Sequence, residues 1–206
     1  MAKIAVLDYG IGNLRSAQKA FERSGADAYL TADEELVLAS DGVVLPGVGN
    51  FGNCATALTD SGVREIAFAA VENKIPFLGI CVGMQLLFDS SEESPEAKGL
   101  GLISGKVKLL VEAPKVPQMQ WNQINLTNSS PLLEGLEGEW FYFVHSYALG
   151  QTEEQNIAIA TCDYRSPVIA AVQKELVFGT QFHPEKSGKA GRLLLRNFIS
   201  ICENLI

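Results

Sequence analysis

Residues 76–83 read PFLGICVG, which predicts a buried strand that turns sharply into a helix at Cys81. Glycines stand two residues before and two residues after the cysteine, as in the G-x-S-x-G nucleophile elbow, with a thiol in place of the hydroxyl. Glycines are needed where the turn is tight and another part of the chain passes so close that a Cβ atom would collide. The elbow would also place the sulfur at a helix N-terminus, where the dipole favours a thiolate. The alternative is an ordinary core cysteine.

Upstream of this elbow, short apolar runs alternate with amphipathic stretches. Strands are expected at 3–8, 27–31, 42–46 and 76–80, and helices at 13–24, 33–39, 54–73 (broken near Ser61-Gly62) and 82–88. Beyond residue 90, strand-like segments follow at 105–111, 121–126, 140–145, 157–162, 168–173 and 176–182, before a last helix at about 189–205. This order predicts one α/β domain over residues 1–206, with a central, largely parallel but mixed sheet flanked by helices.

Composition and charge exclude several classes of protein. Apolar residues make up 47% of the chain, and 24 acidic against 16 basic residues give a net charge of -8, which argues against a polyanionic partner such as nucleic acid. The four cysteines form no C-x-x-C pair and there are only two histidines, so no metal site is expected. No apolar run is long enough for a signal peptide or a membrane span, which favours a cytoplasmic protein with reduced thiols.

A thiolate nucleophile needs a base, and the candidates are His145 and His183. His183 follows the apolar run 176–182, so we expect it at the carboxyl end of a strand, where active sites of parallel sheets collect. Glu185 stands two residues further on and could hydrogen-bond the second ring nitrogen, as the third member of a triad does. The alternative is a structural histidine. We therefore interpret Cys81, His183 and Glu185 as the catalytic residues.

Two glycine-containing turns follow other strands. Pro46-Gly47-Val48-Gly49 could present backbone N–H groups of Val48 and Gly49 which, with the N–H of Val82, would form an oxyanion hole, although a simple loop is the alternative. Gly10-Ile11-Gly12-Asn13 invites a dinucleotide-binding interpretation, but Arg15 replaces the third glycine of G-x-G-x-x-G. Asn13 is better interpreted as a helix N-cap or a surface group there.

At these residues the sequence resembles the class I, triad-type glutamine amidotransferases, and within them the amidotransferase subunits of imidazole glycerol phosphate synthases. The resemblance extends nearly from end to end. The general class is indicated by residues 81–88 (CVGMQLLF) and 181–188 (QFHPEKSG), and the narrower group by 7–13 (LDYGIGN), 46–49 (PGVG) and 141–147 (FYFVHSY).

The resemblance implies a class I amidotransferase (flavodoxin-like) fold and hydrolysis of glutamine without metal or organic cofactor. It implies that the glutamine substrate contacts Gln85, Glu93, Ser146 and Tyr147. It further implies that ammonia passes to a separate (β/α)₈-barrel cyclase subunit in a heterodimer of histidine biosynthesis. The edge that carries Cys81, with Asn13 and Tyr142, would then form the partner interface.

One segment departs from the family pattern. Residues 116–122 (VPQMQWN) carry Gln118 and Gln120 where the family commonly has His and Gly, so no role is assigned to these two positions. Three other functions stay open on sequence alone. They are an amidotransferase subunit of another synthase (anthranilate, aminodeoxychorismate or purine pathway), a cysteine peptidase on a similar fold, and a non-catalytic module with a vestigial site.

Overall fold

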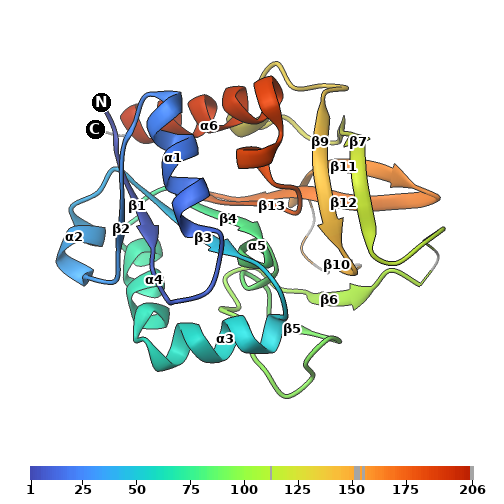
Figure 1. Ribbon diagram of the computed structural model, residues 1–206, viewed down its shortest axis with the longest axis horizontal. Helices are drawn as coiled ribbons and strands as arrows, with labels where there is room; N and C mark the ends of the chain where they lie inside the picture. Colours follow the sequence, from blue (N-terminus) through green and yellow to red (C-terminus); the bar gives the residue numbers. More distant parts are fainter. Residues whose placement is uncertain (112, 151–153, 155, 205–206) are drawn as a thin grey trace.

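The computed structural model describes residues 1–111, 113–150, 154 and 156–204. Its centre is an eight-stranded sheet in the order β2-β1-β3-β4-β13-β12-β11-β8 (Figure 1). The first five strands are parallel and the last three pairings are antiparallel. The strands are β1 (Lys3–Leu7), β2 (Asp27–Thr31), β3 (Gly42–Gly47), β4 (Phe77–Cys81), β8 (Asn125–Leu126), β11 (Ala158–Tyr164), β12 (Ser166–Lys174) and β13 (Val177–Thr180). The parallel half has the strand order of flavodoxin-like sheets, which confirms the expected fold class.

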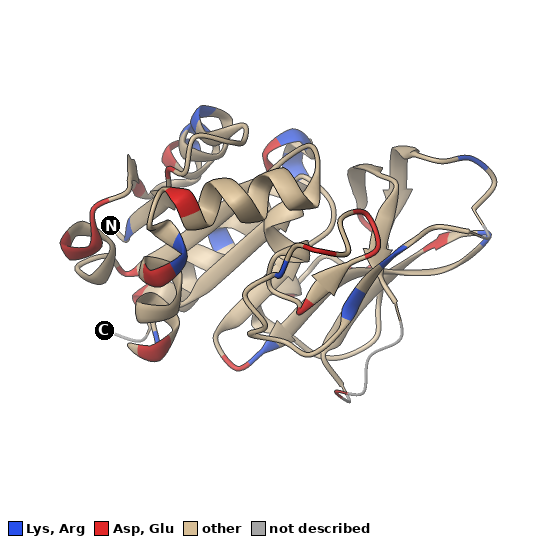
Figure 2. Cartoon of the chain, turned by 90° about the horizontal axis from the view of Figure 1, so that it is seen from below, with Lys and Arg blue, Asp and Glu red and all other residues tan. Residues whose placement is uncertain are grey.

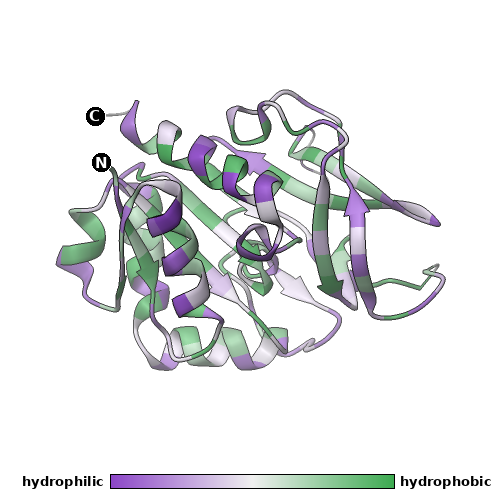
Figure 3. Ribbon diagram, turned by 45° about the horizontal axis from the view of Figure 1, so that its top comes forward, coloured by the Kyte–Doolittle hydropathy of each residue, from purple (hydrophilic) through white to green (hydrophobic). Residues whose placement is uncertain are grey.

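Helices cover both faces of the parallel strands. On one face lie α1 (Leu14–Ser24) and α6 (Gly188–Glu203), and on the other α3 (Phe51–Asp60) and α4 (Val63–Glu72), with α2 (Glu34–Leu38) beside α4 (Figure 1). Figure 3 shows mostly apolar strands at the centre of the sheet, whereas the helices alternate apolar and polar bands, as expected of elements that bury one side only. The expected helix over 54–73 is two helices, and its break falls at Ser61 and Gly62 as predicted.

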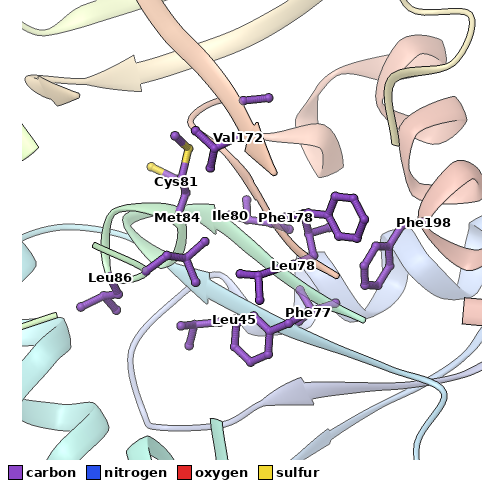
Figure 4. Close-up of a cluster of buried hydrophobic side chains, with 14 of the residues drawn as sticks. Leu45, Phe77, Leu78, Ile80, Cys81, Met84, Leu86, Val172, Phe178 and Phe198 are labelled. Atoms are coloured by element: carbon purple, nitrogen blue, oxygen red, sulfur yellow. The ribbon is translucent and has the colours of Figure 1, made fainter. Parts of the chain in front are cut away.

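Aromatic side chains join the sheet to its helices. The Phe198 ring of α6 lies 6.0 Å from Phe21 of α1 and 6.2 Å from Phe178 of β13. Figure 4 shows this cluster continuing along β4 through Phe77 and Leu78 toward Cys81. The elbow cysteine therefore stands at the end of a strand that is packed rigidly into the core.

The remaining strands form two small sheets beside the main one. One contains β5 (Ser90–Ser91), β6 (Lys106–Leu109) and β10 (Tyr147–Leu149). The other is an antiparallel ribbon of β7 (Gln118–Gln123) and β9 (Trp140–His145). Two 3₁₀ turns, η1 (Pro131–Leu133) and η2 (Pro184–Lys186), complete the described elements.

Several expected boundaries were wrong. The helix expected at 82–88 is only the four-residue α5 (Val82–Gln85). After Leu86 the backbone tightens to i→i+3 hydrogen bonds, from the Leu87 N–H to the Met84 carbonyl (3.0 Å) and from the Phe88 N–H to the Gln85 carbonyl (3.2 Å), so the α-helix does not continue. The segment 121–126 is split between β7 and β8, and the short strands β5 and β10 were not anticipated. The last helix ends at Glu203, and residue 205 lies outside the described part of the chain.

Three expectations concern what the fold lacks. All four cysteines are buried and free. Within the described ranges, no cluster of three or more potential metal ligands occurs, and no helix combines the length and apolarity needed to cross a membrane. Acidic and basic residues are interspersed over the helices and loops (Figure 2).

Candidate active site

The elbow at Cys81 has the strained geometry that its sequence predicts. Cys81 has φ 56° and ψ -112°, in the left-handed half of φ space that L residues rarely occupy. A Cβ atom at Gly79 would lie 2.6 Å from the Gly83 carbonyl oxygen, and one at Gly83 would collide with the Leu45 carbonyl. The two glycines therefore allow α5 to fold back against β3 and β4, as expected.

Cys81 occupies the N-cap position of α5, so its sulfur lies at a helix N-terminus, as expected. Because α5 has four residues, it is a single turn, and its aligned peptide dipoles are too few to polarise the sulfur strongly.

His183 and Glu185 form a buried pair where β13 leads into η2. His183 Nδ1 lies 2.7 Å from Glu185 Oε1, and the side chains are only 2% and 4% exposed. The backbone of His183 is also fixed, since its N–H donates to the Tyr142 carbonyl (3.0 Å) and its carbonyl accepts from the Ser187 hydroxyl (2.6 Å). Burial disfavours the charged imidazole, but hydrogen bonds to Cys81 and Glu185 outweigh it and raise the pKa of His183 to about 10. This imidazole can hold a proton taken from the Cys81 thiol.

His145, the other candidate base, has a different environment. Its Nδ1–H donates to the Tyr147 carbonyl (2.8 Å), so Nε2 carries the lone pair, and that atom has no partner among the described residues. Burial lowers the pKa of His145 to about 4, which keeps the ring neutral. No carboxylate of the described residues orients its ring, so the geometry favours His183 as the base.

A cavity of about 630 Å³ opens over Cys81, a size that suits a small polar ligand. It brings together most of the residues predicted from sequence: Asn13, Val48, Gly49, Cys81, Val82, Gln85, Glu93, Ser146, Tyr147 and His183. Glu185 lies behind His183 rather than in the wall, and Tyr142 lies beside the cavity with its ring 6.4 Å from that of His183. The wall also contains residues without a predicted role there: Gly12, Pro117, Val144, His145 and Lys186.

The loop that follows β3 packs directly against the elbow. A Cβ atom at Gly47 would lie 2.6 Å from the Gly83 nitrogen, so the two backbones are in close contact. Gly49 has φ +86°, and the Val48 carbonyl accepts from the Cys54 thiol at 3.3 Å. Val48 and Val82 both line the cavity.

Polar side chains in the cavity wall are held in place by hydrogen bonds. Gln85 Nε2 donates to the Tyr147 carbonyl (2.9 Å) and to Gln181 Oε1 (3.1 Å). Glu93 Oε2 accepts from the Phe51 N–H (2.7 Å) at the start of α3. Gln181 was not among the predicted residues, because only the pairing of β13 with β4 brings it beside Cys81.

Asn13, Gln118 and Gln120 differ in their contacts. Asn13 occupies the N-cap position of α1 without capping a backbone N–H; instead its Oδ1 accepts from the Ser16 hydroxyl (2.7 Å). Gln118 is buried with Nε2 3.6 Å from Cys162 Sγ, whereas Gln120 is exposed. Neither Gln118 nor Gln120 lines the cavity.

Cys81 stands at a turn from a strand into a helix, and a buried His–Glu pair lies at the same carboxyl edge of the sheet. This combination defines a class of enzyme. The family model for "Glutamine amidotransferase class-I" matches residues 5–202, and the chain belongs to this family of enzymes. A solved structure titled as a glutamine amidotransferase has the same fold, with a TM-score of 0.78 at 19% identity over 97% of this chain and 98% of the other.

Two relatives share far more of the sequence. The chain is 47% identical to imidazole glycerol phosphate synthase subunit HisH of Methanothermobacter thermautotrophicus, over 96% of this chain and 98% of the relative. It is 45% identical to subunit HisH 1 of Methanococcus maripaludis, over 96% of this chain and 99% of the relative.

Proposed function

We propose that this chain is the glutaminase subunit of an imidazole glycerol phosphate synthase, in which Cys81, His183 and Glu185 hydrolyse glutamine and the ammonia passes to a cyclase subunit. One observation carries the catalytic part of this proposal. His183 lines the same cavity as Cys81, which is among the groups that raise its pKa, and its Nδ1 lies 2.7 Å from Glu185 Oε1. The 47% identity to a HisH subunit over nearly the whole chain supports the choice of synthase.

Hydrolysis proceeds through a thioester. His183 takes the proton of the Cys81 thiol, and the sulfur attacks the carboxamide carbon of the glutamine side chain. Backbone N–H groups at Val48, Gly49 and Val82 stabilise the tetrahedral oxyanion, and such donors contribute roughly 10²–10³ each in rate. His183 then returns the proton to the departing nitrogen, which leaves as ammonia.

Water completes the cycle. It attacks the γ-glutamyl thioester while His183 accepts one of its protons, and collapse of the second tetrahedral intermediate releases glutamate and restores the thiol. Glu185 stays charged, fixes Nδ1–H of the ring and stabilises the imidazolium. Gln85, Glu93, Ser146 and Tyr147 line the part of the cavity that would hold the α-amino-acid end of glutamine. These steps require no metal or cofactor.

An apolar face beside the cavity supports docking of an ammonia-consuming partner. Met119 and Trp121 of β7 alternate onto one face of the β7–β9 ribbon, opposite Val144 and Tyr142 of β9. Met119 is 61% exposed and Trp121 48%, and Trp140 at the start of β9 is 51% exposed. We call these five residues the ribbon face. It continues into the cavity at Val144, so a subunit seated on it would cover the mouth of the site.

The test is to add candidate partner subunits and measure glutamine-dependent synthesis. The barrel cyclase of imidazole glycerol phosphate synthase, supplied with its ribonucleotide substrate, should form product with glutamine as the only nitrogen source. The anthranilate and aminodeoxychorismate synthase subunits should not. If one of those subunits uses the ammonia and the cyclase does not, the chain serves another synthase.

A further inference from the structure

Gln181 stands two residues before His183 in the sequence. It follows the last residue of β13, it is completely buried, and its backbone N–H donates to the Ala170 carbonyl (2.8 Å). Its side chain points toward the elbow on the neighbouring β4, with Nε2 3.9 Å from Cys81 Sγ. A buried amide beside a nucleophilic sulfur acts on it differently according to whether it presents its N–H or its carbonyl.

The surrounding network decides that orientation. The Tyr147 carbonyl can only accept, so the group of Gln85 that lies 2.9 Å from it must be the amide nitrogen. The second hydrogen of that nitrogen then points at Gln181, 3.1 Å away, which makes the facing atom of Gln181 its carbonyl oxygen. With its oxygen occupied by Gln85, Gln181 presents its N–H to Cys81 Sγ.

We propose that Gln181 is a positioning residue for the nucleophile, which donates an amide N–H to Cys81 Sγ in an orientation imposed by Gln85 and the Tyr147 carbonyl. A donor favours the charged form of the group that accepts from it, so Gln181 stabilises the thiolate and holds the sulfur beside His183. It supplies part of the stabilisation that the single turn of α5 cannot give.

This inference rests on the proposed role of Cys81, and the two can fail separately. If Cys81→Ala retains glutamine hydrolysis, Cys81 is not the nucleophile and the proposed function fails. If Cys81→Ala is inactive but the experiment below shows no effect, only the role of Gln181 fails.

The decisive measurement is the pH dependence of Cys81 alkylation by iodoacetamide in the intact chain, followed by mass spectrometry of the Cys81 peptide. Gln181→Met keeps the length and volume of the side chain but removes the donor. Its alkylation midpoint should move upward by about one pH unit, and alkylation below the midpoint should be about tenfold slower. At neutral pH kcat should fall with little change in KM.

Gln118→Met is the matched control. Gln118 is also a buried glutamine whose Nε2 faces a thiol, but that thiol is Cys162 at 3.6 Å. The Cys81 profile should be unchanged in this variant. An unchanged midpoint in folded Gln181→Met, or an equal shift in Gln118→Met, would overturn the proposal.

Gln85→Met provides a second route if Gln181→Met does not fold. It leaves Gln181 in place but removes the group that orients its amide, so a smaller upward shift is expected. The proposal is wrong if Gln85→Met alkylates with the wild-type profile.

Discussion

At the level of single residues, His183 depends on two neighbours of different chemistry. Burial lowers the pKa of its imidazole, but hydrogen bonding and electrostatic attraction from Cys81 and Glu185 outweigh burial and raise the pKa from 6.5 to about 10. Because the folded-state pKa lies above the unfolded one, protonated His183 stabilises the fold fully below pH 6.5. That contribution is lost as pH rises through about 10.

The variant Glu185→Gln removes the negative charge beside His183 while keeping the shape of the side chain. An amide can still accept from Nδ1–H, but it cannot stabilise the imidazolium as a carboxylate does, so the pKa of His183 should fall from about 10 toward its ordinary range. We expect kcat for glutamine hydrolysis to fall roughly 10²- to 10⁴-fold. NMR titration of the imidazole and steady-state kinetics measure the two effects. Glu93→Gln is the control, which should raise KM without moving the His183 titration, and a wild-type kcat in Glu185→Gln would remove Glu185 from the mechanism.

At the level of elements, the proposed active site lies where the ends of three neighbouring strands, β3, β4 and β13, pack closely together. β4 lies between β3 and β13, with Cys81 opposite Gly47 and Ile80 opposite Thr180. The elbow strand therefore carries the proposed nucleophile, while its two neighbours lead into the candidate oxyanion loop and the proposed base. Such a site tolerates little change in backbone position.

Gly83→Ala should be damaging for this reason. Its Cβ atom would collide with the backbone carbonyl of Leu45, which cannot move without shifting β3. We expect a loss of about 1–3 kcal/mol in the free energy of unfolding, measured in urea, together with a large fall in glutaminase activity. Gly150→Ala is the comparison, because the added Cβ there meets only the flexible Lys108 side chain. Equal stability of the two variants would show that the elbow is not tightly packed.

At the level of the whole molecule, the active-site cavity and the ribbon face form one continuous edge. Val144 belongs to both, and Trp121 packs at 6.1 Å against the ring of Tyr142, which neighbours His183. A partner bound there would stand where ammonia is released. α2, by contrast, lies at the far end of the molecule (Figure 1).

Trp121→Ala and Trp140→Ala should weaken binding to the cyclase subunit while leaving the chain folded. Exposed tryptophans at the centre of an interface commonly contribute more than 1.4 kcal/mol each, so we expect at least a tenfold rise in Kd by calorimetry for one of them. The free energy of unfolding should change by less than about 0.5 kcal/mol. Leu36→Ala, at a 51% exposed position on α2, is the control and should bind normally. Unchanged affinity in both tryptophan variants would place the partner elsewhere.

Local patterns were sufficient for much of the fold and part of the site. The alternation of apolar runs and helices predicted the parallel sheet, and the glycines around Cys81 predicted the close approach that the structure has at Gly79 and Gly83. His183 was expected at a strand end, and β13 does lead to it. The sequence signals for these features come from residues near one another in the chain.

Features that depend on distant contacts were missed. α5 gives way to tighter i→i+3 turns at Leu87 and Phe88, in a segment whose Leu86 and Phe88 carbonyls pair with the distant loop at Leu100 and Gly101. The place of Gln181 beside Cys81 follows from the pairing of β13 with β4, across 100 positions of sequence. The ribbon face exists only because β7 pairs with β9 in a particular register. No local pattern contains these pairings.

The most direct test of the central claim, that Cys81 releases ammonia for a partner enzyme, uses Cys81→Ala together with the cyclase subunit. Product formation is measured with glutamine and, separately, with added ammonium. We predict that the variant loses glutamine-dependent synthesis and keeps ammonium-dependent synthesis at the wild-type rate. Glutamine-dependent synthesis that survives the loss of the thiol would contradict the claim.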